Sequence, residues 1–217
     1  MTVEAALRTG IVRVCVRLAE RGLIAGPDGN VSARLPDGRL LITPSGMSKG
    51  DVREADLAVL DADGNFVSGP CPPSSEKRMH VRIFQRRPDV HAVVHAHPPT
   101  ATGFAVAGED FLAPVLPELI LQMGGVPLIP YATPGSDALA DEFEPFLPHH
   151  DAFLMANHGA TTVGPSLLIA HQRMESLEHG ARILLAARQL GRVRPLAASD
   201  ADVLHAAWRA ARRGGER

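Results

Sequence analysis

Cysteine is scarce in this chain of 217 residues, and its scarcity excludes one class of scaffold. The two cysteines, Cys15 and Cys71, form no CxxC pair, and Cys15 falls on the apolar face of a helical pattern, as a small core residue does. We therefore expect no disulfide framework and, as the default compartment, a reducing cytoplasm. The N-terminal segment MTVEAALRTG lacks a basic region and an uninterrupted apolar region, so we expect no signal peptide.

An excess of positive charge and long apolar runs are also lacking. A formal net charge of −2 argues against nucleic acid as a partner, because a general polyanion binder needs a basic face. Arginines gather only in the C-terminal segment WRAARRGGER, which a solvated helix end explains. No apolar run approaches the roughly 20 residues that span a bilayer, so we expect no membrane partner. With 45% hydrophobic residues, the chain is long enough for one domain over residues 1–217.

Strand and helix patterns are mixed along the chain. Two pairs of short apolar segments joined by tight turns, at residues 31–43 and 57–69, predict β-hairpins. Because hairpins rule out a purely parallel sheet, we expect an α/β fold with a mixed or antiparallel sheet covered by helices. Further strands are expected at 89–97, 126–130 and 151–164. Helices are expected at about 3–21, 74–87, 100–108, 136–147, 165–190 (with Pro165 in the first turn) and 199–213 (with Ser199 as the cap).

A histidine pair interrupts the buried strand expected at residues 89–97. His95 and His97 lie one residue apart in VVHAHPP, so on a strand their side chains point to the same face, about 7 Å apart. Two imidazoles that converge from one strand can form two corners of a tetrahedral zinc site. The alternative is that they are ordinary core histidines. His158, at the end of an apolar segment in ANHG, is a candidate third ligand or a turn histidine exposed to water.

The candidate carboxylate beside such a metal is Glu76. It follows Ser74 and Ser75 in the expected first turn of a helix, where the helix dipole stabilises a negative charge and open amides and hydroxyls can hold an anion. The alternative is a glutamate in a capping arrangement. Two further loops, which border strands, could hold a phosphate without any lysine or could be ordinary turns; their small polar residues are Gly29, Asn30, Ser45 and Gly46.

Five segments, taken in order, resemble the class II aldolase/adducin family, the fold of L-fuculose-phosphate aldolase and L-ribulose-phosphate 4-epimerase. They are GNVSARL, ITPSGM, PPSSEKRMH, VVHAHPPTAT and ANHGA. The likeness covers residues 5–190 and leaves 199–217 as a C-terminal helix and Arg-rich tail. It implies a three-layer α/β/α domain and a homotetramer with active sites at subunit borders.

The resemblance also implies a set of site residues. One Zn²⁺ per subunit would be bound by His95, His97 and His158. Glu76 would be the acid/base carboxylate and would complete the coordination when substrate is absent. A sugar phosphate would be cradled by Gly29, Asn30, Ser45, Gly46, Ser74 and Ser75.

The activity that the resemblance implies is reversible retro-aldol cleavage of a small ketose phosphate, similar to L-fuculose 1-phosphate, into dihydroxyacetone phosphate and an aldehyde. A metal-stabilised enediolate would be the intermediate, and Glu76 would shuttle the proton. Epimerases of the family resemble each other in carrying aspartate at the place of Glu76, which favours carbon–carbon cleavage here. The alternatives are epimerisation, dehydration or decarboxylation through the same intermediate, and a non-catalytic module like the adducin head, which does not keep the metal histidines.

One position departs from the family pattern. Fuculose-phosphate aldolases resemble one another in using a tyrosine from a neighbouring subunit as the proton donor toward the aldehyde. Glu118 stands at that place in this chain, and the only tyrosine, Tyr131, is interpreted as structural. The resemblance therefore does not supply a proton donor on the aldehyde side.

Overall fold

One eight-stranded β-sheet forms the frame of the computed structural model, which describes residues 2–214. The strands lie in the order β4-β3-β2-β1-β5-β8-β7-β6. Neighbouring strands are antiparallel except β6 and β7, which are parallel, so the expected mixed sheet is confirmed. The strands are β1 (Asn30–Arg34), β2 (Leu40–Ile42), β3 (Ala58–Leu60), β4 (Phe66–Ser68), β5 (Ala92–Ala96), β6 (Leu128–Ile129), β7 (Ala152–Met155) and β8 (Gly159–Gly164).

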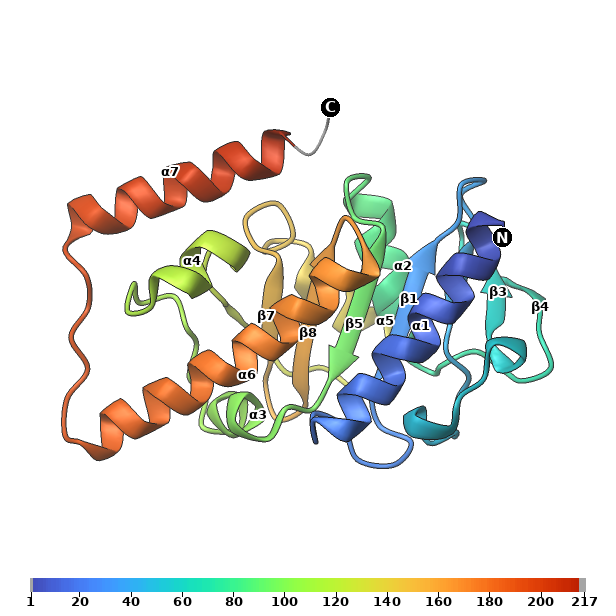
Figure 1. Cartoon of the computed structure of the whole chain (residues 1–217), viewed down its shortest axis with the longest axis horizontal. Coiled ribbons are helices and arrows are strands. Elements are labelled where there is room, and N and C mark those ends of the chain that lie inside the picture. Colours follow the sequence, from blue (N-terminus) through green and yellow to red (C-terminus); the bar gives the residue numbers. More distant parts are fainter. Residues whose placement is uncertain (1, 215–217) are drawn as a thin grey trace.

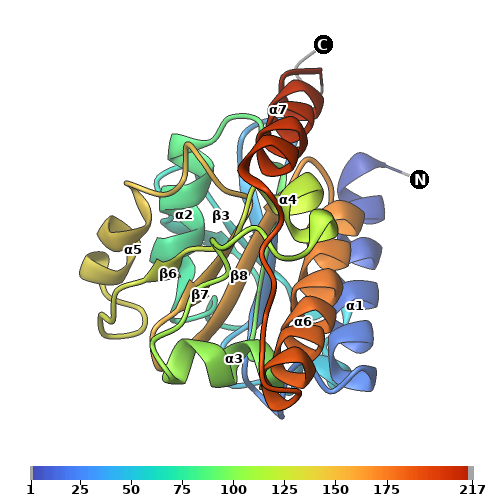
Figure 2. The same cartoon turned by 90° about the vertical axis from the view of Figure 1, so that its left-hand side faces the viewer.

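Helices cover both faces of the sheet and produce the expected three layers (Figure 2). On one face lie α1 and α6 and on the other lie α2 and α5, and each face has its own apolar core. The helices are α1 (Val3–Glu20), α2 (Lys77–Arg86), α3 (Pro99–Val106), α4 (Pro117–Met123), α5 (Asp137–Phe143), α6 (Leu167–Gln189) and α7 (Ala198–Gly214), with short 3₁₀ helices at Lys49–Asp51 and Glu54–Asp56. None of the helices within residues 2–214 combines the length and the apolar character needed to cross a membrane.

Strand β5 shows how the sheet divides its side chains between the two cores. Val94 packs into the core on the side of α1 and α6, whereas Val93 packs into the core on the side of α2 and α5. Because side chains alternate along a strand, His95 points with Val93 toward α2. Glu76 stands at the start of α2, so the fold brings this carboxylate toward the face of β5 that carries the histidine.

Three helix starts differ from the sequence expectation. Helix α2 begins at Lys77, so Glu76 is its N-cap residue rather than a first-turn residue, and the Glu76 side chain makes no capping hydrogen bond. Helix α6 begins two residues after Pro165, which therefore precedes the helix. Helix α7 already includes Ser199, so that serine does not cap it. Short helix α4 was not expected at all. Caps depend on where the chain enters a helix, and tertiary packing sets that point.

Helix α7 packs against α4 and not on the sheet (Figure 1). The segment that leads to it is held where the Leu196 amide donates to the carbonyl of Pro114 at 2.8 Å. Trp208, which is 7% exposed, covers Gly124. The φ angle of Gly124 is 73°, and a Cβ there would lie 2.7 Å from the indole ring, so only glycine fits. Residues 215–217 of the expected Arg-rich tail lie outside the described residues.

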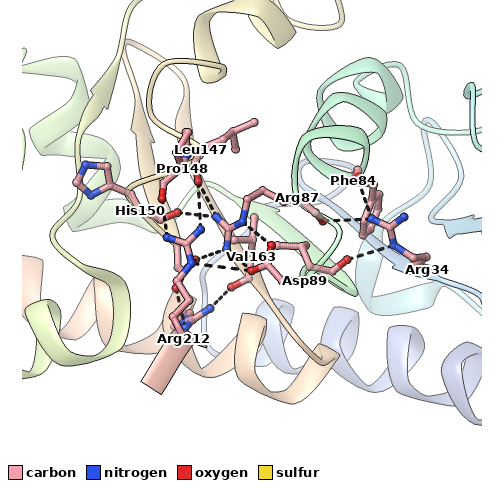
Figure 3. A network of polar contacts seen from close by, with 12 residues as sticks. Arg34, Phe84, Arg87, Asp89, Leu147, Pro148, His150, Val163 and Arg212 are labelled. Atoms are coloured by element: carbon pink, nitrogen blue, oxygen red, sulfur yellow. Dashed lines mark hydrogen bonds and ion pairs between the residues drawn. The ribbon is translucent and has the colours of Figure 1, made fainter. Parts of the chain in front are cut away.

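A buried carboxylate, that of Asp151, joins the start of β7 to three other elements. Its oxygens lie 2.8 Å from Arg87 after α2, 2.9 Å from Arg173 in α6 and 3.7 Å from Arg212 in α7. Arg87 also pairs with Asp89 at 2.7 Å; Figure 3 shows Arg87, Asp89 and Arg212 directed toward one another. Asp151 is 1% exposed, so its charge is balanced by these guanidinium groups.

We predict that Asp151→Asn lowers the free energy of unfolding by about 3 kcal/mol, because it takes the counter-charge from the buried guanidinium group of Arg173 and leaves Arg87 with Asp89 alone. Urea unfolding monitored by circular dichroism measures the change. The control is Asp37→Asn, the same substitution in the exposed pair with Arg39, which should leave the unfolding midpoint in place. An equal effect of the two substitutions would contradict the assignment of Asp151 as a structural centre.

Candidate active site

Three histidines meet at one end of strand β5. His95 is the fourth residue of the strand, His97 follows the last residue, and His158 lies in the turn between β7 and β8. The antiparallel pairing of β5 with β8 sets Ala96 opposite Ala160, which places that turn beside the end of β5. The ring centroids lie 4.8 to 5.1 Å apart. One ligand atom from each ring falls within 4.8 Å of the others, so the three residues could hold a metal ion.

The turn that carries His158 has two unusual residues. Asn157 has a φ of 56°, in the left-handed region that few non-glycine residues occupy. At Gly159, a Cβ would lie 2.5 Å from Cδ2 of His97 and 2.6 Å from the carbonyl oxygen of Ala96. The glycine is therefore needed because the end of β5 and the His97 ring approach this strand closely.

Glu76 completes the cluster. Its Oε2 lies 3.2 Å from Nε2 of His95 and its Oε1 lies 3.4 Å from Nε2 of His158, and the residue is 8% exposed. Burial raises the pKa of this carboxyl group, but His95, His158 and Asn30 together outweigh burial and hold the pKa well below its usual range. An ionised carboxylate therefore faces the histidines.

The direction of the hydrogen bonds leaves nitrogen lone pairs facing the centre of the cluster. Nδ1–H of His95 donates to the carbonyl of Ala160 at 2.9 Å, an arrangement that commonly orients a metal-binding histidine. Its Nε2 then lies 3.2 Å from Nε2 of His97 and equally far from Glu76. Burial lowers the pKa of His95, yet Glu76 outweighs burial and raises it. The centre of the cluster therefore favours a positive charge, either a proton or a metal ion.

The other two histidines are suited to metal coordination because they are neutral. Burial, followed by the proximity of His95, lowers the pKa of His97 and lowers the pKa of His158 to about 4. A neutral imidazole has a free lone pair, which coordination requires. Oε1 of Glu76 and Nδ1 of His158 are buried and accept or donate no hydrogen bond among the described residues. Three neutral or proton-sharing imidazoles and one carboxylate are a donor set that fits Zn²⁺.

Two of the loops expected to bind phosphate lie side by side. The Ser45 amide donates to Pro72 at 3.0 Å and the Ser74 amide donates to Thr43 at 3.0 Å. These two amides hold the loops together and are not open to an anion. Ser45, Gly46 and Ser75 are exposed, whereas Ser74 is buried and its hydroxyl accepts from the Glu76 amide at 3.3 Å.

The third loop has a different set of contacts. At Gly29, φ is 71° and a Cβ would lie 2.8 Å from the carbonyl oxygen of His95, so glycine allows β1 to start against β5. The side-chain Nδ2 of Asn30 donates to Oε2 of Glu76 at 2.8 Å. Both residues therefore border the histidine cluster, whether or not a phosphate also binds there.

Sequence reasoning missed a lysine behind these loops. Lys49 is 2% exposed, and its Nζ donates to the carbonyls of Pro27 at 2.7 Å and Met47 at 2.8 Å. Its own amide donates to Gly26 at 3.1 Å. Lys49 thus ties the loop before β1 to the loop after β2. A lysine in a glycine- and serine-rich segment gives no sequence signal of such burial.

Glu118, Tyr131 and His91 lie elsewhere. Glu118 is in the first turn of α4 and lines a surface cavity together with residues of α6. Tyr131 is 62% exposed. A cavity of about 880 Å³ lies at the opposite end of β5, where His91 lines it, and contains none of the three clustered histidines. Chemistry and not cavity size therefore locates the candidate site.

The sequence and the structure of this chain are similar to those of several known proteins. The profile of the Class II Aldolase and Adducin N-terminal domain matches residues 9–185. A 3-oxo-tetronate 4-phosphate decarboxylase from Escherichia coli K12 is 36% identical over 186 residues, which cover 84% of this chain and 87% of that protein. An L-fuculose phosphate aldolase from Methanococcus maripaludis is 33% identical over 176 residues, 81% of this chain and 94% of that one. The crystal structure of YgbL from Escherichia coli is 34% identical with a TM-score of 0.87, covering 94% and 100% of the two chains.

We predict that His97→Ala strips the metal from the purified protein, because three histidine ligands leave no spare donor. Mass spectrometric analysis of zinc per chain after dialysis measures this. The matched control is His91→Ala, an exposed histidine just before the same strand, which should retain zinc. Full zinc occupancy in His97→Ala would remove His97 from the ligand set.

Proposed function

The chain belongs to the class II aldolase and adducin family, whose enzymes act on small sugar phosphates, and from this premise we propose that it is a metal-dependent decarboxylase of a 3-oxo sugar acid phosphate. The substrate class follows the name of the relative that is 36% identical over most of both chains. Retro-aldol cleavage, which the resemblance led us to expect, becomes the second candidate, and the fuculose phosphate aldolase supports it at 33% identity.

The observation that carries the proposal is the set of acid/base groups at the histidine cluster. Two carboxylates touch it among the described residues: Glu76, which is buried, and Asp28, whose oxygen lies 3.5 Å from Nδ1 of His97 and whose side chain is 47% exposed. Tyr131 is exposed and Glu118 lies on α4. The cluster thus has one buried carboxylate among the described residues.

Decarboxylation needs one proton transfer, whereas retro-aldol cleavage needs two. In a 3-oxo-tetronate 4-phosphate, the bond between C1 and C2 breaks, carbon dioxide leaves, and the electron pair passes from C2 into the C3 carbonyl. One proton added to C2 then gives dihydroxyacetone phosphate. Retro-aldol cleavage must also remove a proton from the hydroxyl group that becomes the aldehyde. One buried carboxylate therefore suits loss of carbon dioxide.

In this proposal the chain's residues have separate tasks. His95, His97 and His158 hold a divalent cation, with Glu76 as a further ligand in the absence of substrate. That cation supplies a Lewis acid, which stabilises negative charge on the substrate's oxygens. Glu76, which is ionised in the free protein, takes up a proton from water once the substrate is bound and gives it to C2. The phosphate lies against the loops of Ser45, Gly46, Ser74 and Ser75, beside Gly29 and Asn30.

Zinc as the natural metal and a homotetramer with active sites at subunit borders stay predictions that the family resemblance implies. Light scattering after size-exclusion chromatography measures the number of subunits. The number of subunits bears on the number of carboxylates at the histidine cluster. Glu118 could reach the cluster only from a neighbouring subunit, across a subunit border.

A comparison of substrates tests the proposed function. The zinc-loaded protein is incubated with 3-oxo-tetronate 4-phosphate or with L-fuculose 1-phosphate, and carbon dioxide and dihydroxyacetone phosphate are measured. We expect both products from the first compound, in equal amounts, with a kcat/KM well above that for cleavage of the second. Preference for the ketose phosphate would overturn decarboxylation in favour of retro-aldol cleavage.

We predict that Glu76→Gln loses about a hundredfold or more in turnover, the usual scale for a general acid or base. The amide keeps the shape of the side chain but cannot exchange a proton with carbon. The direct measurement is exchange of the carbon-bound hydrogens of dihydroxyacetone phosphate in deuterated water, followed by NMR. Glu20→Gln, at an exposed position at the end of α1, is the control. Exchange at the parental rate in Glu76→Gln would remove Glu76 from the proton-transfer role.

A further inference from the structure

A chain of buried hydrogen bonds stands behind Glu76. Ser32 in β1 has its Oγ 2.6 Å from Nδ1 of His80 in α2. Nε2 of His80 bonds to Oδ1 of Asn30, and Nδ2 of Asn30 donates to Oε2 of Glu76 at 2.8 Å. Ser32 and His80 are 0% exposed and Asn30 is 3% exposed. These hydrogen bonds therefore lead from β1 to α2 and back to β1 before they reach the carboxylate.

The carboxylate fixes the direction of every bond in this chain. An ionised Glu76 only accepts, so Asn30 must present its NH₂ group to Glu76 and its carbonyl oxygen to His80. His80 must then carry its proton on Nε2, which leaves Nδ1 to accept from the hydroxyl of Ser32. Burial lowers the pKa of His80 to about 3, so the imidazole is neutral and has one donor and one acceptor, as the chain requires.

A flip of the Asn30 side-chain amide would place two hydrogen-bond acceptors against each other. A flipped Asn30 would set its carbonyl oxygen against Oε2 of Glu76, which is acceptor against acceptor at 2.8 Å. With the His80 proton on Nε2, the NH₂ group of a flipped Asn30 would also meet this N–H, donor against donor, so the neutral imidazole supports the orientation that Glu76 sets. Glu76 has no capping bond of its own at the start of α2, so the bond from Asn30 is a main restraint on its orientation.

We propose that Ser32, His80 and Asn30 form a positioning relay that holds the Glu76 carboxylate in one orientation toward the histidine cluster. His80 is the central positioning residue: it touches neither the clustered histidines nor, in the proposed function, the substrate. The inference rests on the acid/base role proposed for Glu76, and it gives Asn30 a task different from phosphate binding. Residues that orient groups at a metal site in this way commonly change activity by roughly 10- to 100-fold when replaced.

Two substitutions of similar volume at His80 test the relay. In His80→Gln, the side-chain amide can donate to Asn30 and accept from Ser32, whereas His80→Met can do neither. We expect His80→Met to lose roughly 10- to 100-fold in kcat, with KM and zinc content near the parental values, and His80→Gln to recover most of the loss. Ser75→Ala is the comparator. Because this substitution removes a proposed contact to the substrate's phosphate, it should raise KM and preserve kcat.

A second measurement does not depend on activity. Long-range ¹H–¹⁵N NMR spectra of metal-free protein labelled in histidine identify which nitrogen of His80 is protonated, with His80→Gln providing the assignment. We expect the proton on Nε2. A proton on Nδ1 would overturn the relay, as would an unchanged kcat in His80→Met or an equal loss in the Gln and Met variants.

Ser32→Ala covers the case in which His80→Met fails to fold. This smaller change should also reduce kcat while KM holds, and an unchanged kcat in a folded Ser32→Ala protein would overturn the relay. If the parent protein decarboxylates no substrate, the proposed function fails by itself. The relay is then decided by the NMR spectra and by hydrogen exchange of dihydroxyacetone phosphate, which report on His80 and Glu76 directly.

Discussion

The antiparallel register of β1, β5 and β8 is the constraint on which the candidate site depends. Asn30 lies opposite His95 across the pair β1–β5, and Thr161 lies opposite His95 across β5–β8. A shift of either pair by one residue would turn the side chains of one strand to the other face. The same register places the turn with His158 at the end of β5. Three backbone segments that are distant in sequence therefore deliver their polar groups to one point.

Burial of the Glu76 carboxylate at this site has an electrostatic cost. An ionised carboxylate enclosed by protein is costly unless it is paired, and Glu76 finds two imidazoles and one amide instead of a permanent cation. A divalent ion bound by the histidines would supply the missing positive charge. The proposed chemistry uses the same charge, because loss of carbon dioxide leaves an electron pair that must be stabilised. In this account, the positive charge of the bound ion both balances the buried carboxylate and stabilises the electron pair that carbon dioxide leaves behind.

The sequence predicts local features of the site better than long-range ones. The two-residue period of a strand places His95 and His97 on one side, and the hairpin signals predict a sheet that is not purely parallel. The position of His158 beside them depends on the pairing of β5 with β8, and only the family resemblance supplied that proximity. The bonds of Asn30 to Glu76 and of His80 to Asn30 join residues 46 and 50 positions apart, and no spacing rule detects them.

Several misses have the same physical cause. Glu76 was expected in the first turn of α2, but the helix begins at Lys77 because the preceding loop is pinned to the loop after β2. Lys49 was overlooked because a buried lysine is rare. Its two carbonyl partners come from loops that only the folded chain brings together. Loop-to-loop contacts of this kind decide side-chain roles that local patterns leave open.

The most direct test of the account is the position of a bound metal. Anomalous diffraction from zinc-soaked crystals, recorded on both sides of the zinc absorption edge, locates the ion without any assumption about activity. The account predicts one strong peak per chain, within about 2.0–2.1 Å of a ring nitrogen of each of His95, His97 and His158. A peak bound elsewhere, or no peak at this cluster in zinc-saturated crystals, would contradict it.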